Sequence, residues 1–351
     1  MMRLEARSST PHWFNLALPV AAVAATLLLC SSLIALAGAP VLSSYAIMAR
    51  AAFGDFYAVT ETLVRAAPMI FTGLAVAVAF RAKFWNIGAE GQLLAGAVAS
   101  CAMGAIAMPG PLAMLAMAIA GAVAGSLAAL LPALLRVKLK VDDVVSSLLL
   151  NSVIFFALMA LIEGPWKDSL SGYPISPPIQ DSAIFPVFVE GTRLHIGVLA
   201  ALLTAPLIWF VISRTVLGFS IRVTGENPEA ARYAGISIDR VLISTALLSG
   251  GLAGLAGVCE VGGVHYQVMA EISPGYGYSG IVIAMLARLN PLGVVPAAIF
   301  LSAVMTGADA MSRATGVPAF LSDVIQGMAL LSMLVALLFT SYRLRFKGGS
   351  S

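Results

Sequence analysis

The sequence predicts an all-α membrane protein, a polytopic helical bundle of about ten transmembrane helices, some of them broken or short. Two observations lead to this class. Of the 351 residues, 60% are hydrophobic and 11% are charged, whereas soluble domains carry about 25% charged residues. The apolar residues also form continuous runs close to the ~20 residues that a spanning helix needs, without the period-two alternation of a membrane β-barrel.

Ten apolar windows justify the predicted helices in chain order. The first follows Arg3 and Arg7 like a signal peptide, but its run exceeds the usual core of about 7–15 residues, and we interpret it as a span. The eighth is short and ends at Asn290-Pro291, so the eighth and ninth are expected to form a hinged pair. Totals of eight or nine spans are the alternatives. The windows are 15–39, 62–80, 88–107, 112–135, 144–163, 195–213, 241–263, 277–288, 291–309 and 318–340.

Lys and Arg residues predict the orientation, because they are enriched in cytoplasmic loops. With the amino terminus inside, most of the 20 Lys and Arg residues fall on the cytoplasmic side. Ten spans then place both termini there. We expect residues 1–351 to form a single transmembrane domain. Between spans, 164–194 is rich in Pro, Ser and Gly and is expected as an extracytoplasmic loop, and 214–240 as a cytoplasmic one.

The cytoplasmic loop 214–240 contains the signals of a short helix. Asn227 suits the N-cap, Pro228 the first helical position and Glu229 the first turn. Gly235 is placed to end the helix after about two turns. A helix this short is marginal alone in water. It is therefore expected to dock, either on its own membrane domain or in a groove of a cytoplasmic partner.

A polar stretch, FWNIGAEGQLLAGA, opens the third apolar window at residues 84–97. In one interpretation, Asn86 or Gly88 caps the helix and Glu90 lies near its positive end. In the other, the glycines let the turn dip into the bundle, where Glu90 and Gln92 offer hydrogen bonds to the hydroxyls of a ligand. The sequence is compatible with both interpretations.

Other polar residues in the spans have a similar choice of roles. Asn151 is expected to hydrogen-bond between helices or to contact a ligand. Tyr276 and Tyr278 flank a glycine at the predicted outer mouth, where they anchor at the interface or stack on a ring. Glu260 falls near a span end and is expected to be solvated there.

Four segments carry a resemblance to a known family. In order and spacing they resemble the permease subunits of bacterial ABC importers for nucleosides and simple sugars, in the branched-chain amino-acid and ribose permease superfamily. The chain departs from the family where it has Asp142-Asp143 for the usual Asn-Glu, and Ala287 for the usual Gly. The segments are FWNIGAEGQLLAGA (84–97), GENPEAARYAGIS (225–237), SPGYGYSGIVIAMLARLNPLGVV (273–295) and GVPAFLSDVIQGMALL (316–331).

The resemblance implies a transport subunit of the bacterial plasma (inner) membrane, with neither catalytic residues nor a metal or cofactor. Its implied partners are a second permease chain, identical or sister, cytoplasmic ABC ATPase subunits and an extracytoplasmic substrate-binding protein, all at a lipid bilayer and without nucleic acid. The loop is similar to the family's coupling helix, which seats in the ATPase. The corresponding residues are Gly225, Glu226, Asn227, Pro228, Glu229, Ala230, Ala231, Arg232 and Gly235. The expected substrate-path residues are Asn86, Glu90, Gln92, Asn151, Tyr276 and Tyr278.

The expected function is ATP-driven import by alternating access, of a nucleoside or purine-like compound or, as the alternative, a simple sugar. The sequence contains no G-x-x-x-x-G-K-[ST] phosphate loop, so ATP hydrolysis is expected on a partner. An ion-coupled secondary transporter is a further alternative. It would need carboxylates or histidines deep in the bundle, whereas most acidic residues here fall near predicted span ends.

Overall fold

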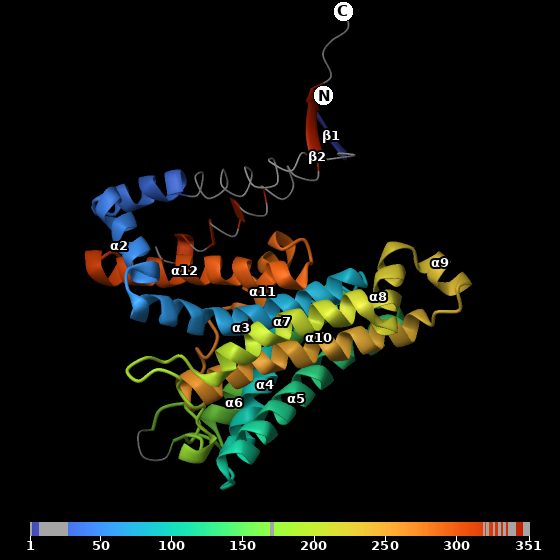
Figure 1. The fold of residues 1–351 in the computed structure, drawn as a ribbon, viewed down its shortest axis with the longest axis horizontal. Helices are drawn as coiled ribbons and strands as arrows, with labels where there is room; N and C mark the ends of the chain where they lie inside the picture. Colours follow the sequence, from blue (N-terminus) through green and yellow to red (C-terminus); the bar gives the residue numbers. More distant parts are fainter. Residues whose placement is uncertain are drawn as a thin grey trace, which may run out of the picture. The chain divides into compact units, whose positions relative to one another are not determined.

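The structure is a computed structural model in which helices predominate (Figure 1). It describes residues 2–6, 27–168, 172–318 and 342–346, together with 320, 323–325, 327–328, 331–332 and 335. The labelled elements are β1 (Met2–Ala6), α2 (Val41–Phe53), α3 (Phe56–Arg81), α4 (Ala89–Gly104), α5 (Gly110–Leu139), α6 (Asp143–Glu163), η1 (Asp181–Ala183), α7 (Ile196–Arg214), α8 (Val216–Glu226), α9 (Pro228–Tyr233), α10 (Ile238–Glu260), η2 (Val261–His265), α11 (Tyr276–Leu286), α12 (Pro291–Thr315) and β2 (Tyr342–Phe346).

Among the described residues, six helices are long and apolar enough to cross a membrane: α3, α5, α6, α7, α10 with η2, and α12. A pair bent by 119°, Leu27–Leu36 with α2, raises this number to seven if it forms one span. The predicted number of ten is not confirmed. Helix α4 has 16 residues and α11 has 11, and both are short beside the ~20 of a full span. Windows 15–39 and 318–340 lie partly outside the described residues.

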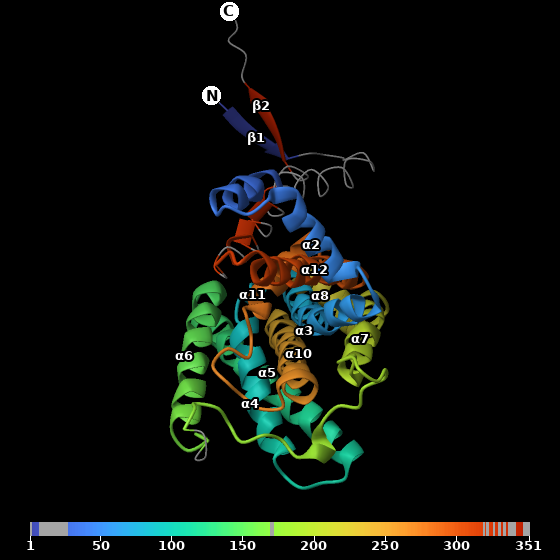
Figure 2. The ribbon, with the colours of Figure 1, turned by 90° about the vertical axis from the view of Figure 1, so that its left-hand side faces the viewer.

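The chain divides into two compact units, Thr60–Ser302 and Met1–Val59 with Ala303–Ser351. In the first unit, α4, α5 and α10 pack most closely, and α6 lies against α4 and α5 (Figure 2). Glycines allow this approach: a Cβ atom at Gly254 of α10 would collide with the carbonyl oxygen of Gly121 in α5, and one at Gly257 with that of Leu93 in α4. Small residues give membrane helices the close contact that lipid-embedded helices need.

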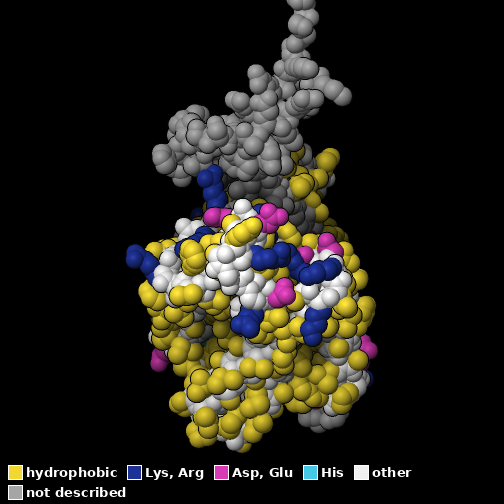
Figure 3. Space-filling model, turned by 90° about the vertical axis from the view of Figure 1, so that its right-hand side faces the viewer, with side chains coloured by type: hydrophobic (Ala, Val, Ile, Leu, Met, Phe, Trp, Pro, Cys, Tyr) yellow, Lys and Arg dark blue, Asp and Glu magenta, His cyan; other side chains and the backbone are white. Residues whose placement is uncertain are grey.

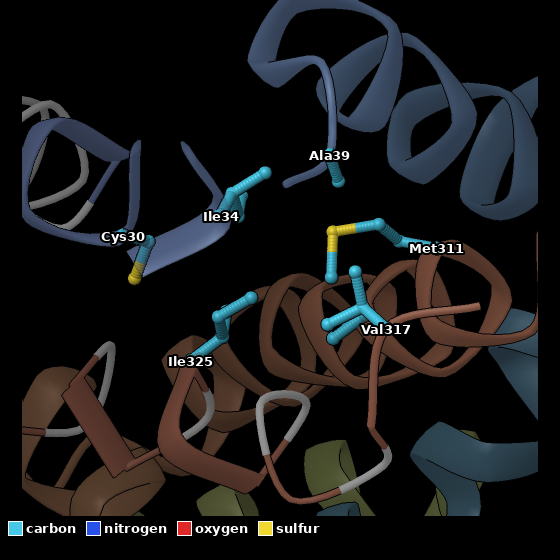
Figure 4. Close-up of a cluster of buried hydrophobic side chains, with 7 residues drawn as sticks. Cys30, Ile34, Ala39, Met311, Val317 and Ile325 are labelled. Carbon is cyan, nitrogen blue, oxygen red and sulfur yellow. The ribbon is translucent and has the colours of Figure 1, made fainter. Parts of the chain in front are cut away.

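In the second unit, the segment before α2 and the end of α12 contribute to a small apolar cluster (Figure 4). Ile34 and Met311 are completely buried there, and Val41 and Met48 pack against them. The strands β1 and β2 also belong to this unit and pair antiparallel, with Met2 opposite Phe346. The helical class agrees with the prediction, and this short pair lies outside the helices. It lets two terminal segments outside the helices satisfy each other's backbone groups.

The segments 164–194 and 214–240 lie at opposite ends of α7. The first contains η1 and two isolated β-bridges, Ile175 with Met269 and Val187 with His195. The second contains the predicted short helix as α9, together with α8, which the sequence analysis missed. Figure 3 shows Lys and Arg side chains on the face that carries α8 and α9.

Candidate functional site

The polar stretch at 84–97 forms a buried turn between α3 and α4, followed by the first turns of α4. Phe84 and Asn86 are completely buried, and Lys83 has a positive φ of 53° where the chain leaves α3. Buried backbone N–H and C=O groups require partners. Side chains from the turn itself and from other helices provide them here.

Asn86 organises the inside of the turn. Its Oδ1 accepts hydrogen bonds from the backbone N–H of Gly88 at 3.0 Å and from Nε2 of Gln92 at 2.8 Å. Its Nδ2 donates to Oε1 of Gln92 and to Oγ of Ser249 in α10, both at 2.9 Å. The Ser249 hydroxyl in turn donates to the carbonyl of Ala75 in α3 at 2.7 Å. Asn86 and Gln92 therefore hold α3, α4 and α10 together.

Helix α6 supplies partners for the outside of the turn. Asp143, Ser147 and Asn151 are spaced four residues apart, which places them on one face of the helix. Asp143 Oδ2 accepts from the N–H of Trp85 at 2.5 Å, and Ser147 Oγ from the N–H of Ile87 at 3.1 Å.

Asn151 makes two contacts with the same turn. Its Oδ1 accepts from the N–H of Gly91 at 2.8 Å, and its Nδ2 donates to the carbonyl of Ile87 at 2.9 Å. The prediction that Asn151 hydrogen-bonds between helices is thus confirmed. The three side chains of α6 form what we call the α6 polar stripe, residues Asp143, Ser147 and Asn151.

Glu90 faces the other way, toward α11. The N–H of Gly277 donates to its Oε2 at 2.6 Å, and the Ser273 side chain also hydrogen-bonds to it. A Cβ at Gly277 would collide with the backbone N of Glu90, so this glycine is what allows α11 to approach α4. The carboxyl group lies at the amino-terminal end of α11, where the helix dipole favours negative charge.

A pocket of about 330 Å³ opens between α4, α6, α11 and the segment before α11. Three of the predicted substrate-path residues line it: Glu90, Asn151 and Tyr278. Polar groups converge at one side, since Asn151 Nδ2 also donates to the Tyr278 hydroxyl at 3.3 Å. Sequence reasoning missed the other lining residues, which are Leu94, Ser152, Phe155, Phe156, Ala270, Ser273 and Gly275.

The other three predicted path residues lie outside the lining of this pocket. Asn86 and Gln92 are buried in the turn, with exposed fractions of 0% and 1%. Tyr276 is buried at the start of α11, where its carbonyl accepts from Thr72 Oγ1 at 2.9 Å. Asn86 and Gln92 thus bond to each other within the turn, and Glu90 reaches the pocket.

Helix α9 is exposed on the face of the bundle where Figure 3 shows Lys and Arg side chains. The Asn227 side chain caps it, accepting from the N–H groups of Glu229 and Ala230 at 3.0 Å each. Gly235 follows with a φ of 77°, as the predicted helix end requires. Ala231 packs inward, and Tyr233 is 97% exposed. At the end of α8, a Cβ on Gly225 would collide with the carbonyl oxygen of Arg81, so α8 packs directly on the end of α3.

Charged groups also meet at the opposite end of the bundle. Arg193, just before α7, forms an ion pair with Glu61 of α3. Glu260 of α10 is 2% exposed, and its Oε2 lies 3.3 Å from Nε2 of His265. The expectation that Glu260 is solvated is therefore wrong. Glu260 is buried like the residues that precede it in α10, and its partner His265 lies in η2.

Comparisons with known proteins identify relatives along the whole chain. Residues 58–334 match a family model described as the permease component of branched-chain amino acid transport systems. The glucose ABC transporter permease protein TsgB13 of Haloferax volcanii is 34% identical over 97% of this chain and 93% of its own length. The guanosine ABC transporter permease protein NupP of Bacillus subtilis is 32% identical over 95% and 96%. The nucleoside ABC transporter permease protein NupB of Lactococcus lactis is 29% identical over 76% of each chain.

Substitutions at Asn86 and Glu90 separate the two roles. Asn86→Ala removes partners from several buried polar groups, each worth about 1–3 kcal/mol when left unsatisfied. We expect it to lower the thermal unfolding temperature of the purified protein markedly. Glu90→Gln keeps an oxygen for the N–H of Gly277 and should lower that temperature little. Equal losses of stability for the two variants would contradict this division.

Proposed function

Because the chain belongs to the family of permease components of branched-chain amino acid transport systems, we propose that it is the membrane-spanning subunit of an ATP-driven importer of nucleosides. It works with a second permease chain, identical or sister, in the plasma membrane. Cytoplasmic ABC ATPases supply the energy, and an extracytoplasmic binding protein delivers the substrate. The chain itself conducts the substrate by alternating access and makes or breaks no covalent bond.

The pocket beside Glu90 is the observation that carries the substrate class. Its volume of about 330 Å³ lies at the small end of the range of about 300–1,000 Å³ for small-molecule sites. Glu90, Asn151 and Ser273 offer acceptors and donors to sugar hydroxyls. Aromatic rings also line the pocket, and stacking on an aromatic ring stabilises a bound nucleobase by about 1–3 kcal/mol. A nucleoside would use both, because its sugar can bond to the polar groups and its base can stack on the aromatic rings.

A simple sugar is the second candidate. The permease of Haloferax volcanii that is 34% identical to this chain is named for glucose, and the hydroxyl-binding side of the pocket suits a sugar without a base. The aromatic side favours the nucleoside, as do the names of the Bacillus and Lactococcus relatives.

The exposed helix α9 supports the proposed division of labour. Lys and Arg enrichment predicts that its end of the bundle is cytoplasmic. Glu226, Asn227, Pro228, Glu229 and Ala230 are all exposed there, as is Arg232. A short capped helix with an exposed tyrosine is suited to a groove in a partner, since tyrosine is enriched among residues that dominate binding energy. We assign α9 as the coupling helix that seats in the ATPase.

Reconstitution tests the function as a whole. Proteoliposomes that contain the permease, its cognate ATPase and the binding protein should accumulate guanosine or adenosine when ATP is present on the ATPase side. Ribose and glucose, supplied in parallel, should accumulate at least about tenfold less, which is the factor that 1.4 kcal/mol of lost stacking produces. Accumulation of sugars in place of nucleosides would favour the sugar candidate, and uphill uptake without the ATPase would favour an ion-coupled transporter.

Charge reversal on the coupling segment tests the ATPase contact. The double variant Glu226→Lys, Arg232→Glu should insert and fold normally, because both side chains are exposed. It should lower substrate-stimulated ATP hydrolysis at least about tenfold, since repelling charges at an interface cost about 1–2 kcal/mol or more. Lys138→Glu, an exposed charge at the end of α5, is the matched control. Normal stimulation in the double variant would contradict the assignment of α9.

A further inference from the structure

The α6 polar stripe joins two places that the proposed function requires to move together. One is the packed end of α3, on which α8 lies. The other is the pocket. The turn between α3 and α4 runs from the first to the second, and the stripe holds this turn along its length. This inference rests on the proposed function and concerns how the same site is coupled to the ATPase.

The contacts at the α9 end are direct. Gly225 of α8 packs on the carbonyl of Arg81, a contact that is possible because glycine has no Cβ atom. Arg81 Nε donates to the carbonyl of Leu289 at 2.9 Å, which ties the same point to the turn that follows α11. Two residues further along, the carbonyl of Lys83 accepts from Nη1 of Arg136 at 2.8 Å, and Arg136 forms an ion pair with Asp143. A displacement of α8 therefore acts on the start of the turn and on the first residue of the stripe.

The contacts at the pocket end are equally direct. Asn151 Nδ2 has two hydrogens: one bonds to the carbonyl of Ile87 at 2.9 Å and the other reaches the Tyr278 hydroxyl at 3.3 Å. The second contact is long for a hydrogen bond, and both of its partners line the pocket. A ligand hydroxyl can take this donor from Tyr278 while the bond to Ile87 stays intact. Ligand binding thereby acts on the residue that holds the turn.

Ser147 connects the two ends. It is completely buried, its hydroxyl accepts from the N–H of Ile87 at 3.1 Å, and it donates to the carbonyl of Asp143 at 2.6 Å. Ser147 is not itself one of the residues that line the pocket. We propose that Ser147 and Asn151 are positioning residues that make the turn, the pocket and the α8–α9 end shift as one body. They thereby transmit the occupancy of the pocket to the ATPase contact.

The matched control lies next to Ser147 on the same helix. The Ser146 hydroxyl donates to the carbonyl of the N-cap residue Asp142 at 2.9 Å and, at a longer 3.4 Å, to that of Asp143. Ser147→Ala and Ser146→Ala remove the same atom at neighbouring positions. The reconstituted complex serves for both, with thermal unfolding, the KM for nucleoside uptake, and the number of nucleosides imported per ATP hydrolysed as the measurements.

We expect Ser147→Ala to lower the number of nucleosides imported per ATP about tenfold, the factor for one lost hydrogen bond to a buried N–H, with a smaller effect on KM. Ser147→Thr, which keeps the hydroxyl, should restore the coupling. Ser146→Ala should behave as the wild type. If Ser147→Ala fails to fold, Ser147→Cys replaces it, because a thiol leaves no cavity at this position and accepts hydrogen bonds only weakly. It should give an intermediate loss.

A double-mutant cycle checks that the pocket and the stripe act together. The effects of Ser147→Ala and Glu90→Gln on nucleosides imported per ATP should be non-additive, whereas those of Ser146→Ala and Glu90→Gln should multiply. Ser147→Ala or Ser147→Cys with wild-type coupling would overturn the inference alone. So would an additive cycle between Ser147→Ala and Glu90→Gln, or a loss that Ser147→Thr fails to restore. A wild-type complex without ATP-dependent uptake would overturn the proposed function and the inference with it.

Discussion

The buried turn between α3 and α4 exists because side chains satisfy its backbone. A peptide group left unpaired in the bundle would cost about 1–3 kcal/mol, and in hydrocarbon water does not replace the missing partner. Asn86 bonds to the turn from within, and Asp143, Ser147 and Asn151 from α6. With these groups paired, the chain can place the polar residue Glu90 at a pocket between helices. The position of the pocket follows from this arrangement.

Close helix packing is the second requirement. Glycines on α5 and α10 bring backbones into contact, and Gly277 lets α11 reach α4 so that its N–H bonds to Glu90. In the same way, the absence of a side chain at Gly225 lets α8 pack against the backbone of Arg81. Backbone contacts of this kind leave little room for independent movement, because packed interiors transmit displacement rather than absorb it. A bundle built in this way is suited to rigid-body motion between two arrangements.

The sequence predicted what depends on local pattern. Apolar runs located α3, α5, α6, α7, α10 and α12, and the sequence Asn227-Pro228-Glu229 located α9 with its cap. Glu90 was singled out because a carboxylate beside an apolar run is costly. Of the α6 polar stripe, Asn151 was expected to bond between helices, but Ser147 was missed. A serine in an apolar helix is an ordinary small residue, and its partner Ile87 lies 60 residues earlier in the chain. Phe155 and Ser273 were missed for the same reason: what makes them pocket residues is the approach of α11 to α4 and α6.

The structure of the complete complex with a bound nucleoside would test most directly whether the pocket binds substrate and α9 binds the ATPase. The permease, its ATPase and the nucleoside, held in one state by a nucleotide analogue that resists hydrolysis, would be determined by cryo-electron microscopy. We expect ligand density within hydrogen-bonding distance of Glu90 and Asn151, with the turn still held by Ser147, and α9 seated in the ATPase. Nucleoside bound away from this pocket, or an ATPase docked on a part of the permease other than α9, would contradict the account.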